Sequence, residues 1–351
     1  MLRIISVISA TVSAVVMLGL ASVEVGMAAE VKVPHLATAK GGFRYGFPEE
    51  IQKKGLKFAQ RRIPIKRRDV RERILRQLNY LLLDRRSRVL LWLSRADSYK
   101  TVIGPILKNY RLPPEFIYLA AIESSFNPRA LSSAGAYGYW QFIKSTAQCG
   151  PAGCAEYDWK MNVAKWKDER ADLVHSTHSA ARYLAWMCRV KKVRLKGKEE
   201  RDGFRNWILT AAAYNAGPAR VIQRLNDYGS VSYWDVPLPL ETEKYVPRWI
   251  ALSLIGKYRK FYGVEPPARP KIRFETVRRI RLKKDLSVTA IARLLNKTPR
   301  QIWTLNTQIP PDKAVFPAKY RGRSMAHTIY VPAGTKRKFL AQLKAHGYVG
   351  K

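Results

Sequence analysis

The chain has 351 residues, which is enough for two or three domains that each bury a core. Its 64 Lys and Arg residues against 26 Asp and Glu give a formal charge of +38. Such an excess indicates a polyanionic partner: nucleic acid, an anionic membrane surface or an acidic polymer such as cell wall. Composition excludes a membrane-spanning segment anywhere beyond the first residues, because no later stretch is apolar enough to cross a bilayer.

The N-terminus has the pattern of an export signal. Arg3 precedes an uncharged run over residues 4–23, and small residues follow at Gly26, Ala28 and Ala29. We expect residues 1–29 to be a signal peptide that is cleaved near its end. The run is also long enough to remain as an uncleaved membrane anchor. Residues 30–62 are basic and contain Gly and Pro, which predicts a loose lead-in.

Helices are predicted from the end of this lead-in. Apolar residues recur with helical spacing at Val70, Ile74, Leu78 and Leu82, which indicates one amphipathic helix. Two more helices are expected, through residues 89–93 and 99–110. Residues 63–112 would thus form a helical collar in front of the next segment.

That next segment contains an isolated carboxylate, Glu123. Pro114 and Glu115 suit the first turn of a helix, and residues 116–122 are apolar on every side. Asn127-Pro128 is expected to end the helix. Glu123 would then lie on the last turn of a buried helix, where desolvation raises the pKa of a carboxyl group. A general acid needs such a pKa, although a lone buried Glu is more often structural.

A glycine-rich turn follows at residues 132–141, SSAGAYGYWQ. Its glycines indicate that the backbone approaches another group closely, and Trp140 looks exposed beside the amide of Gln141. Glycine, aromatic and amide next to a protonatable carboxylate are typical of a carbohydrate cleft. Trp140 either stacks on a sugar or belongs to the core.

Four motifs occur in a fixed order. Glu123-Ser124 is followed by Gly-Ala-x-Gly-x-x-Gln at residues 135–141, by AYNAG at 213–217 and by LPLETEKYV at 238–246. Gly217-Pro218 predicts a turn between two helices, and Glu241 and Tyr245, four residues apart on a helix, would share a face. Over residues 63–262 the chain resembles the lysozyme-like SLT catalytic domain of family 1 lytic transglycosylases, and the membrane-bound lytic murein transglycosylase D group in particular. The helix predicted from residues 168–170 onward, DERADLVHSTHSAARYL, is similar too, but we expect it to be a scaffold with solvent-facing charges.

The resemblance implies a mainly α, goose-type-like lysozyme fold in a bacterial envelope protein that acts on peptidoglycan strands without a cofactor. Glu123 would be a single general acid and base that cleaves between N-acetylmuramic acid and N-acetylglucosamine and leaves 1,6-anhydromuramoyl ends. No acidic residue follows Glu123 until Glu156. The residues expected to bind substrate are Ser124, Gln141, Ile143, Tyr214, Asn215, Glu241 and Tyr245.

Cysteines are few. Cys149 and Cys154 bracket the loop CGPAGC, where a short disulfide is plausible in an oxidising compartment. Cys188 and the nearby histidines, His175 and His178, lack the spacing of a zinc finger, so no metal site is expected.

Residues 263–271 are rich in proline and form an expected stiff linker. Residues 272–334 predict the order strand, helix, helix, strand, which resembles a degenerate LysM glycan-binding module in a small α+β domain. Lys283-Lys284-Asp285 lacks the usual glycine, so a structural appendage is the alternative to glycan binding. Residues 335–351 would be a basic tail with a surface helix.

Three other functions remain open. A goose-type-like lysozyme would use the same cleft with water as acceptor. A catalytically silent scaffold would bind peptidoglycan and release nothing. A nucleic-acid binder would explain the charge, but the export signal and the lack of a matching motif argue against nucleic acid as a partner.

Overall fold

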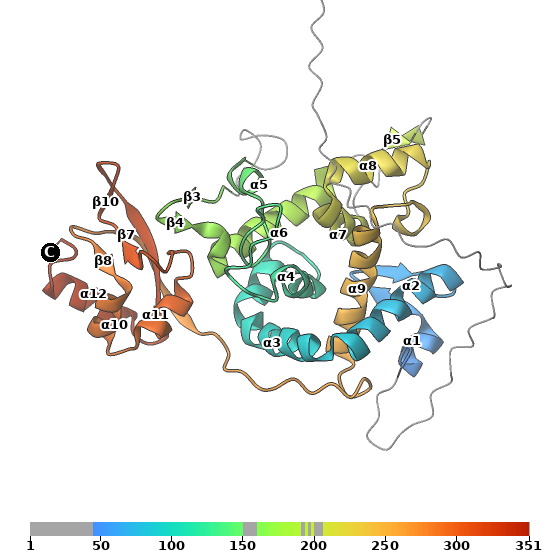
Figure 1. Ribbon diagram of the computed structural model, residues 1–351, viewed down its shortest axis with the longest axis horizontal. Coiled ribbons are helices and arrows are strands. Elements are labelled where there is room, and N and C mark those ends of the chain that lie inside the picture. Colours follow the sequence, from blue (N-terminus) through green and yellow to red (C-terminus); the bar gives the residue numbers. More distant parts are fainter. Residues whose placement is uncertain (1–44, 150–159, 191–193, 196–197, 200–205, 351) are drawn as a thin grey trace, which may run out of the picture. The chain divides into compact units, whose positions relative to one another are not determined.

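The computed structural model describes residues 45–149, 160–190, 194–195, 198–199 and 206–350. The expected export segment lies outside these residues. The described chain is mainly helical (Figure 1). In this part of the chain no helix has both the length and the apolar character needed to span a membrane.

The first described elements pack onto the main core. Helix α1 (Glu49–Lys54) is followed by the antiparallel hairpin of β1 (Leu56–Phe58) and β2 (Arg61–Ile63). Phe47, Ile51 and Phe58 are buried in the main hydrophobic core. This differs from the loose lead-in expected up to residue 62, because apolar side chains alternate with charged ones here and give the hairpin one buried face.

The collar is helical but is divided differently from the prediction. Helix α2 (Arg68–Asn79) buries Val70, Ile74 and Leu78, as the spacing predicts, and continues into a π-helical turn, Tyr80–Asp84. Helix α3 (Arg86–Asn109) is a single 24-residue helix where two were predicted. No glycine or proline lies between the two predicted segments, and even Pro105 is accommodated within the helix.

Helix α4 (Ile117–Ser124) lies against α3 and α9 and begins from a 3-10 turn, Pro114–Phe116. It ends earlier than Asn127-Pro128, because Ser125 and Phe126 adopt positive φ angles of 55° and 54°. Helix α5 (Lys144–Cys149) follows the glycine-rich turn.

Among the described residues between α5 and α6, there is one short strand pair. Strands β3 (Val163–Ala164) and β4 (Lys167–Asp168) pair, and a 3-10 turn, Glu169–Ala171, precedes α6 (Leu173–Val190). The helix thus begins at Leu173 rather than near residue 168. A second short pair, β5 (Arg194–Leu195) with β6 (Lys198–Glu199), comes after α6.

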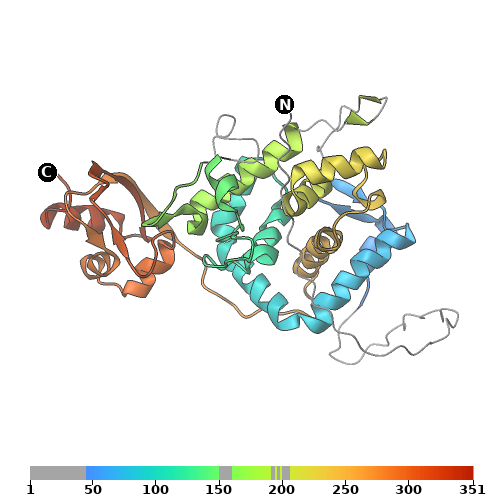
Figure 2. The ribbon, with the colours of Figure 1, turned by 45° about the horizontal axis from the view of Figure 1, so that its top comes forward.

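The remaining helices of this part carry the last two motifs. Helices α7 (Trp207–Ala216) and α8 (Pro218–Asp227) meet at Gly217, whose φ is 85°, so the predicted turn between two helices is confirmed. After a 3-10 turn, Tyr233–Asp235, helix α9 (Leu240–Lys257) crosses the core and packs against α2, α4 and α7 (Figure 2).

The C-terminal part has a second, smaller core. Strand β7 (Phe274–Arg281) pairs antiparallel with β12 (Ala326–Pro332). Between them lie β8 (Leu286–Ser287), α10 (Val288–Leu295), α11 (Pro299–Leu305), β9 (Val315–Phe316), β10 (Lys319–Tyr320) and β11 (Arg323–Ser324). The predicted order of strand, helix, helix and strand is confirmed. Helix α12 (Lys336–Ala345) is more than a surface tail, because Phe339 and Leu343 are fully buried in this core.

The proline-rich segment is held along α3. The hydroxyl of Ser94 donates to the carbonyl of Pro267 at 2.6 Å, and that of Ser98 donates to Pro270 at 2.5 Å. The backbone N–H of Ile272 donates to the carbonyl of Ser98 at 3.1 Å. Ser94 and Ser98 are four residues apart, so both hydroxyl groups lie on one face of α3. They donate hydrogen bonds to the carbonyls of the proline-rich segment, whose prolines have no backbone N–H.

Candidate active site

Glu123 is held by a tyrosine from another helix. It lies at the end of α4, and the hydroxyl of Tyr245, near the start of α9, donates to its Oε1 at 2.5 Å. Burial raises the pKa of Glu123 to about 7, while the hydrogen bond from Tyr245 lowers it. Burial also raises the pKa of the Tyr245 hydroxyl well above its usual range, so this phenol stays a donor. A carboxyl group with a pKa near neutrality can both give and accept a proton.

Glu241 adds to this shift without touching Glu123. It is exposed on the first turn of α9, one turn before Tyr245. Its negative charge raises the pKa of Glu123 further, after the larger effect of burial. Glu241 and Tyr245 were predicted to share one face of a helix. In agreement with this, both affect the pKa of the same carboxyl group, that of Glu123.

Hydrogen bonds of Ser124 and Ser125 hold the end of α4 in place. Ser124 is buried, and its hydroxyl lies 3.1 Å from the carbonyl of Ala120 and 2.7 Å from that of Tyr139. Next to it, Ser125 accepts a hydrogen bond from the indole of Trp92 at 2.7 Å on its hydroxyl and one from Arg95 at 2.5 Å on its carbonyl. Ser124 thus braces the helix end instead of facing the carboxylate of Glu123.

The glycine-rich turn is built against the segment before α6. A Cβ at Gly138 would lie 1.9 Å from the carbonyl oxygen of Arg170, so only glycine fits there. The guanidinium of Arg170 donates to the carbonyls of Gly135 at 3.2 Å and Phe142 at 3.1 Å, and it pairs with Asp168 at 2.7 Å. The close approach predicted from the glycines is therefore an approach to backbone.

This finding corrects the prediction for residues 168–170, whose charges were expected to face solvent. Glu169 and Arg170 are each 8% exposed, and Lys167 pairs with Glu169. The glycines indicated that something approaches the turn, but no signal in the sequence identified Arg170 as the partner, because the contact joins segments some thirty residues apart.

The side chains of Trp140 and Gln141 stabilise the glycine-rich turn. Trp140 is fully buried, and its indole N–H donates to the hydroxyl of Thr177 at 3.0 Å, so this side chain is core and not an exposed platform for a sugar. Gln141 has a φ of 50°, and its amide donates to the carbonyls of Ala130 at 2.9 Å and Gly138 at 3.0 Å. Ile143, just beyond, is 42% exposed.

The AYNAG motif contacts two other motifs. The hydroxyl of Tyr214 donates to the carbonyl of Trp140 at 2.6 Å, and the side-chain oxygen of Asn215 accepts a hydrogen bond from Thr242 at 2.7 Å. Among the described residues, the side-chain N–H groups of Asn215 have no partner. Asn215 is therefore held by its oxygen while its donors remain available to a ligand.

An aromatic cluster that was not predicted lies beside the AYNAG motif. Tyr183 and Trp186 of α6 stack with ring centroids 6.0 Å apart, and Tyr183 lies 5.7 Å from the ring of Tyr214. Phe142 lies 6.3 Å from the same ring. The predicted scaffold helix therefore also supports the third motif.

Two expectations concern residues that are only partly described. Cys154 and the side chain of Cys149 lie outside the described residues, so the disulfide stays a prediction, and Cys188 is buried in α6. Within the described ranges, no group of three or more His, Cys, Asp or Glu side chains is arranged to hold a metal ion.

Parts of the chain are similar in sequence to known proteins. Residues 101–236 match the family described as the Transglycosylase SLT domain. The chain is 32% identical to membrane-bound lytic murein transglycosylase D of Escherichia coli strain K12 over 219 residues, which is 61% of this chain and 43% of that protein. The chain thus spans less than half the length of this curated relative.

Two solved structures were also found. One is an inactive mutant of the lytic transglycosylase Slt of Pseudomonas aeruginosa, with 23% identity, a TM-score of 0.35, and coverage of 48% of this chain and 25% of that chain. The other is the 70 kDa soluble lytic transglycosylase of Escherichia coli, with 19% identity, a TM-score of 0.33, and coverage of 53% and 30%.

Proposed function

We propose that the protein is a peptidoglycan lytic transglycosylase, because residues 101–236 match the family described as the Transglycosylase SLT domain. It cleaves the β-1,4 bond between N-acetylmuramic acid and N-acetylglucosamine without water and leaves 1,6-anhydromuramoyl ends. The hydrogen-bonded pair of Glu123 and Tyr245, with a Glu123 pKa of about 7, carries this proposal. Such a carboxyl group can act as acid and then as base within one catalytic cycle.

In the first step, protonated Glu123 donates its proton to the glycosidic oxygen as the bond to the muramoyl C1 breaks. C1 acquires oxocarbenium character and is stabilised by the sugar's own acetamido carbonyl, which the side-chain N–H groups of Asn215 orient. The N-acetylglucosamine leaves with its new hydroxyl group.

In the second step, Glu123 is ionised and removes the proton of the C6 hydroxyl of the same muramoyl residue. The C6 oxygen attacks C1, the 1,6-anhydro ring closes and Glu123 is protonated again. Tyr245 keeps the carboxylate in place throughout because its hydroxyl remains a donor. Tyr214 and Gln141 act indirectly, since both bond to the backbone of the turn that forms one wall.

A hydrolase with the same cleft is the second candidate, and the effect of Glu241 on Glu123 is the observation in its favour. Two-carboxylate glycosidases need a second acid as nucleophile or as the base that activates water. Glu241 is exposed and has no hydrogen bond to Glu123 among the described contacts. Substituting Glu241 therefore distinguishes the two mechanisms.

We also propose a setting for the enzyme. Residues 1–29 direct export to the periplasm or cell envelope, as a cleaved signal or as an anchor. The C-terminal module, with its strand, helix, helix and strand, is LysM-like and holds glycan near the active site. The charge of +38 favours an envelope rich in carboxylates over a neutral polymer.

The test is to digest purified sacculi with wild type, Glu123→Gln and Glu241→Gln, and to identify the released muropeptides by mass spectrometry. Glu72→Gln, which removes an exposed carboxylate on α2, is the matched control. We expect anhydromuramoyl ends from every protein except Glu123→Gln. Reducing ends that disappear in Glu241→Gln would establish the hydrolase, and binding without release by wild type would establish a silent scaffold.

A further inference from the structure

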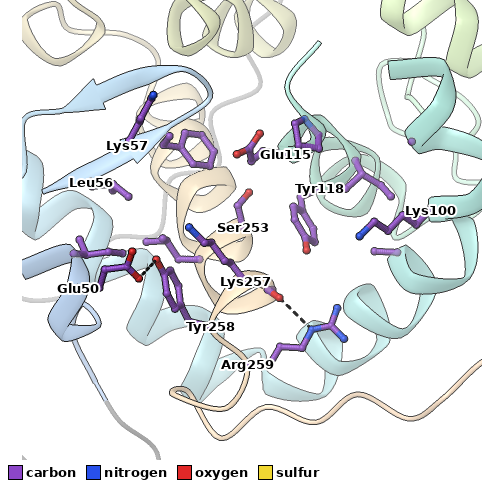
Figure 3. A pocket seen from close by; sticks show the side chains of 18 of the residues that line it. Glu50, Leu56, Lys57, Lys100, Glu115, Tyr118, Ser253, Lys257, Tyr258 and Arg259 are labelled. Atoms are coloured by element: carbon purple, nitrogen blue, oxygen red, sulfur yellow. Dashed lines mark hydrogen bonds between the residues drawn. The ribbon is translucent and has the colours of Figure 1, made fainter. Parts of the chain in front are cut away.

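A pocket of about 590 Å³ lies between the N-terminal hairpin and helices α3, α4 and α9 (Figure 3). Its size is in the range of small-ligand sites. The lining residues of α9 begin at Ser253, eight residues after Tyr245, which is about 12 Å along a helix axis. Neither Glu123 nor Tyr245 lines it, so the pocket is separate from the candidate active site.

The pocket has more cations than its own carboxylates neutralise. Asp97 is occupied by Arg259, with two hydrogen bonds of 2.7 and 2.8 Å, and Glu50 accepts a hydrogen bond from Tyr258 at 3.3 Å. The lysines that line the pocket form no ion pair within the described part of the chain. They are Lys54, Lys57, Lys100 and Lys257. This arrangement favours a ligand with more than one carboxylate.

One acceptor in the pocket wall lacks a donor. Glu115, from the 3-10 turn before α4, and Tyr118, from the first turn of α4, line the pocket (Figure 3). In the described structure, the Oε2 atom of Glu115 is buried and has no hydrogen-bond partner. A buried acceptor of this kind is costly unless a donor reaches it, and a ligand amine satisfies it when the Glu115 carboxylate turns toward the pocket that the residue lines.

Gly256 in α9 allows Tyr118 to approach the helix backbone closely. A Cβ at Gly256 would lie 2.2 Å from the hydroxyl oxygen of Tyr118. Any larger residue there would displace Tyr118, so glycine allows the hydroxyl end of this ring to approach the backbone of α9. The pocket is thus a defined cavity with an apolar and aromatic floor, a lysine-rich rim and one acidic wall.

We propose that this pocket binds the peptide stem of peptidoglycan, as a short peptide that carries free carboxylates and a free amino group. The proposal rests on the proposed function for its choice of peptide. The lysines bind the carboxylates, and Glu115 receives the free amino group. A glycan strand without peptide offers the pocket neither charge, so recognition of the stem is separate from cleavage of the sugar bond.

The probe is a free tetrapeptide stem with a diamino acid, released from peptidoglycan by an amidase and titrated calorimetrically into the full protein. Lys57→Gln with Lys257→Gln removes two rim charges, and Glu115→Gln removes the acidic wall. Lys66→Gln with Lys108→Gln is the matched control, because these exposed lysines do not line the pocket. Each lost rim charge should weaken binding by about two- to fivefold, so the two losses together should weaken it by about fivefold or more.

We expect wild type and the control to bind the tetrapeptide and the double rim variant to bind it at least about fivefold more weakly. Glu115→Gln should weaken binding of the free peptide but not of its N-acetylated form. Glu123→Gln should bind normally. Equal binding by all variants, or no binding by wild type, would overturn the proposal.

Cleavage of peptide-free glycan separates the two proposals. Wild type that cleaves this glycan but binds no peptide would refute the pocket assignment and leave the enzyme intact. Wild type that binds peptide through the rim lysines but cleaves nothing would retain the pocket assignment and refute the proposed activity.

Discussion

The hydroxyl of Tyr245 lies 2.5 Å from the Oε1 atom of Glu123, and it joins the start of α9 to the end of α4. Two residues 122 positions apart in the chain thus form the centre of the candidate site. Burial of Glu123 and the charge of Glu241 raise its pKa, while Tyr245 lowers it, and the balance lies near 7.

Activity should fall as the pH rises through about 7, because the first step needs protonated Glu123. Tyr245→Phe removes the hydrogen bond that favours the ionised form, so the basic limb of the kcat/KM profile should move up by about one pH unit. The measurement is muropeptide release across pH 5 to 9. If the basic limb of the Tyr245→Phe profile stays at the wild-type pH, the limb does not report the titration of Glu123.

Glu123→Gln should make the protein more stable at neutral pH. A carboxyl whose folded pKa is raised contributes its full stability below the unfolded value of 4.5 and loses it as the pH rises toward about 7. Over this window wild type should lose roughly 3 kcal/mol that the amide variant keeps. Chemical unfolding of both proteins at pH 4 and pH 8 measures the difference, and parallel pH dependences would contradict it.

Gly138→Ala should be far more harmful than Gly135→Ala. Both glycines have positive φ angles, 84° and 76°, so both substitutions cost about 1 kcal/mol of backbone strain. Only the Cβ at position 138 meets backbone, at 1.9 Å from the carbonyl of Arg170, which adds at least about 2 kcal/mol. Thermal unfolding of the two variants gives the comparison. Equal losses of stability would mean that the turn moves freely away from Arg170.

Trp140→Phe should destabilise the protein without changing its affinity for substrate. The indole is fully buried and donates to Thr177, so its loss should cost about 2–3 kcal/mol. KM for sacculi at a temperature where the variant is folded should equal that of wild type. A large rise in KM with unchanged stability would instead place this ring against a sugar.

Local pattern was enough to predict much of the fold. The apolar stretch before Glu123 predicted a buried helix and a raised pKa. Gly217-Pro218 predicted the turn between α7 and α8, and the pattern of residues 272–334 predicted the C-terminal strands. In each case the residues that determine the structure are neighbours in the chain.

The failures share a physical cause. Arg170 was expected to face solvent because helical spacing says nothing about the carbonyls of Gly135 and Phe142 that it meets. Trp140 looked exposed because its partner, Thr177, lies 37 residues away. The hydrogen bond between Glu123 and Tyr245 depends on the same long-range packing, and it was not predicted, because the motifs placed Tyr245 only among the substrate-binding residues.

Direct titration of Glu123 tests the central claim. A ¹³C-NMR titration of its side-chain carboxyl carbon, assigned by comparison with Glu123→Gln, gives the pKa in wild type and in Tyr245→Phe. We predict a midpoint near 7 in wild type and a higher one in Tyr245→Phe, each matching the basic limb of activity. A midpoint near the ordinary value of 4.5 in wild type would contradict the account, because Glu123 would then hold no proton to give.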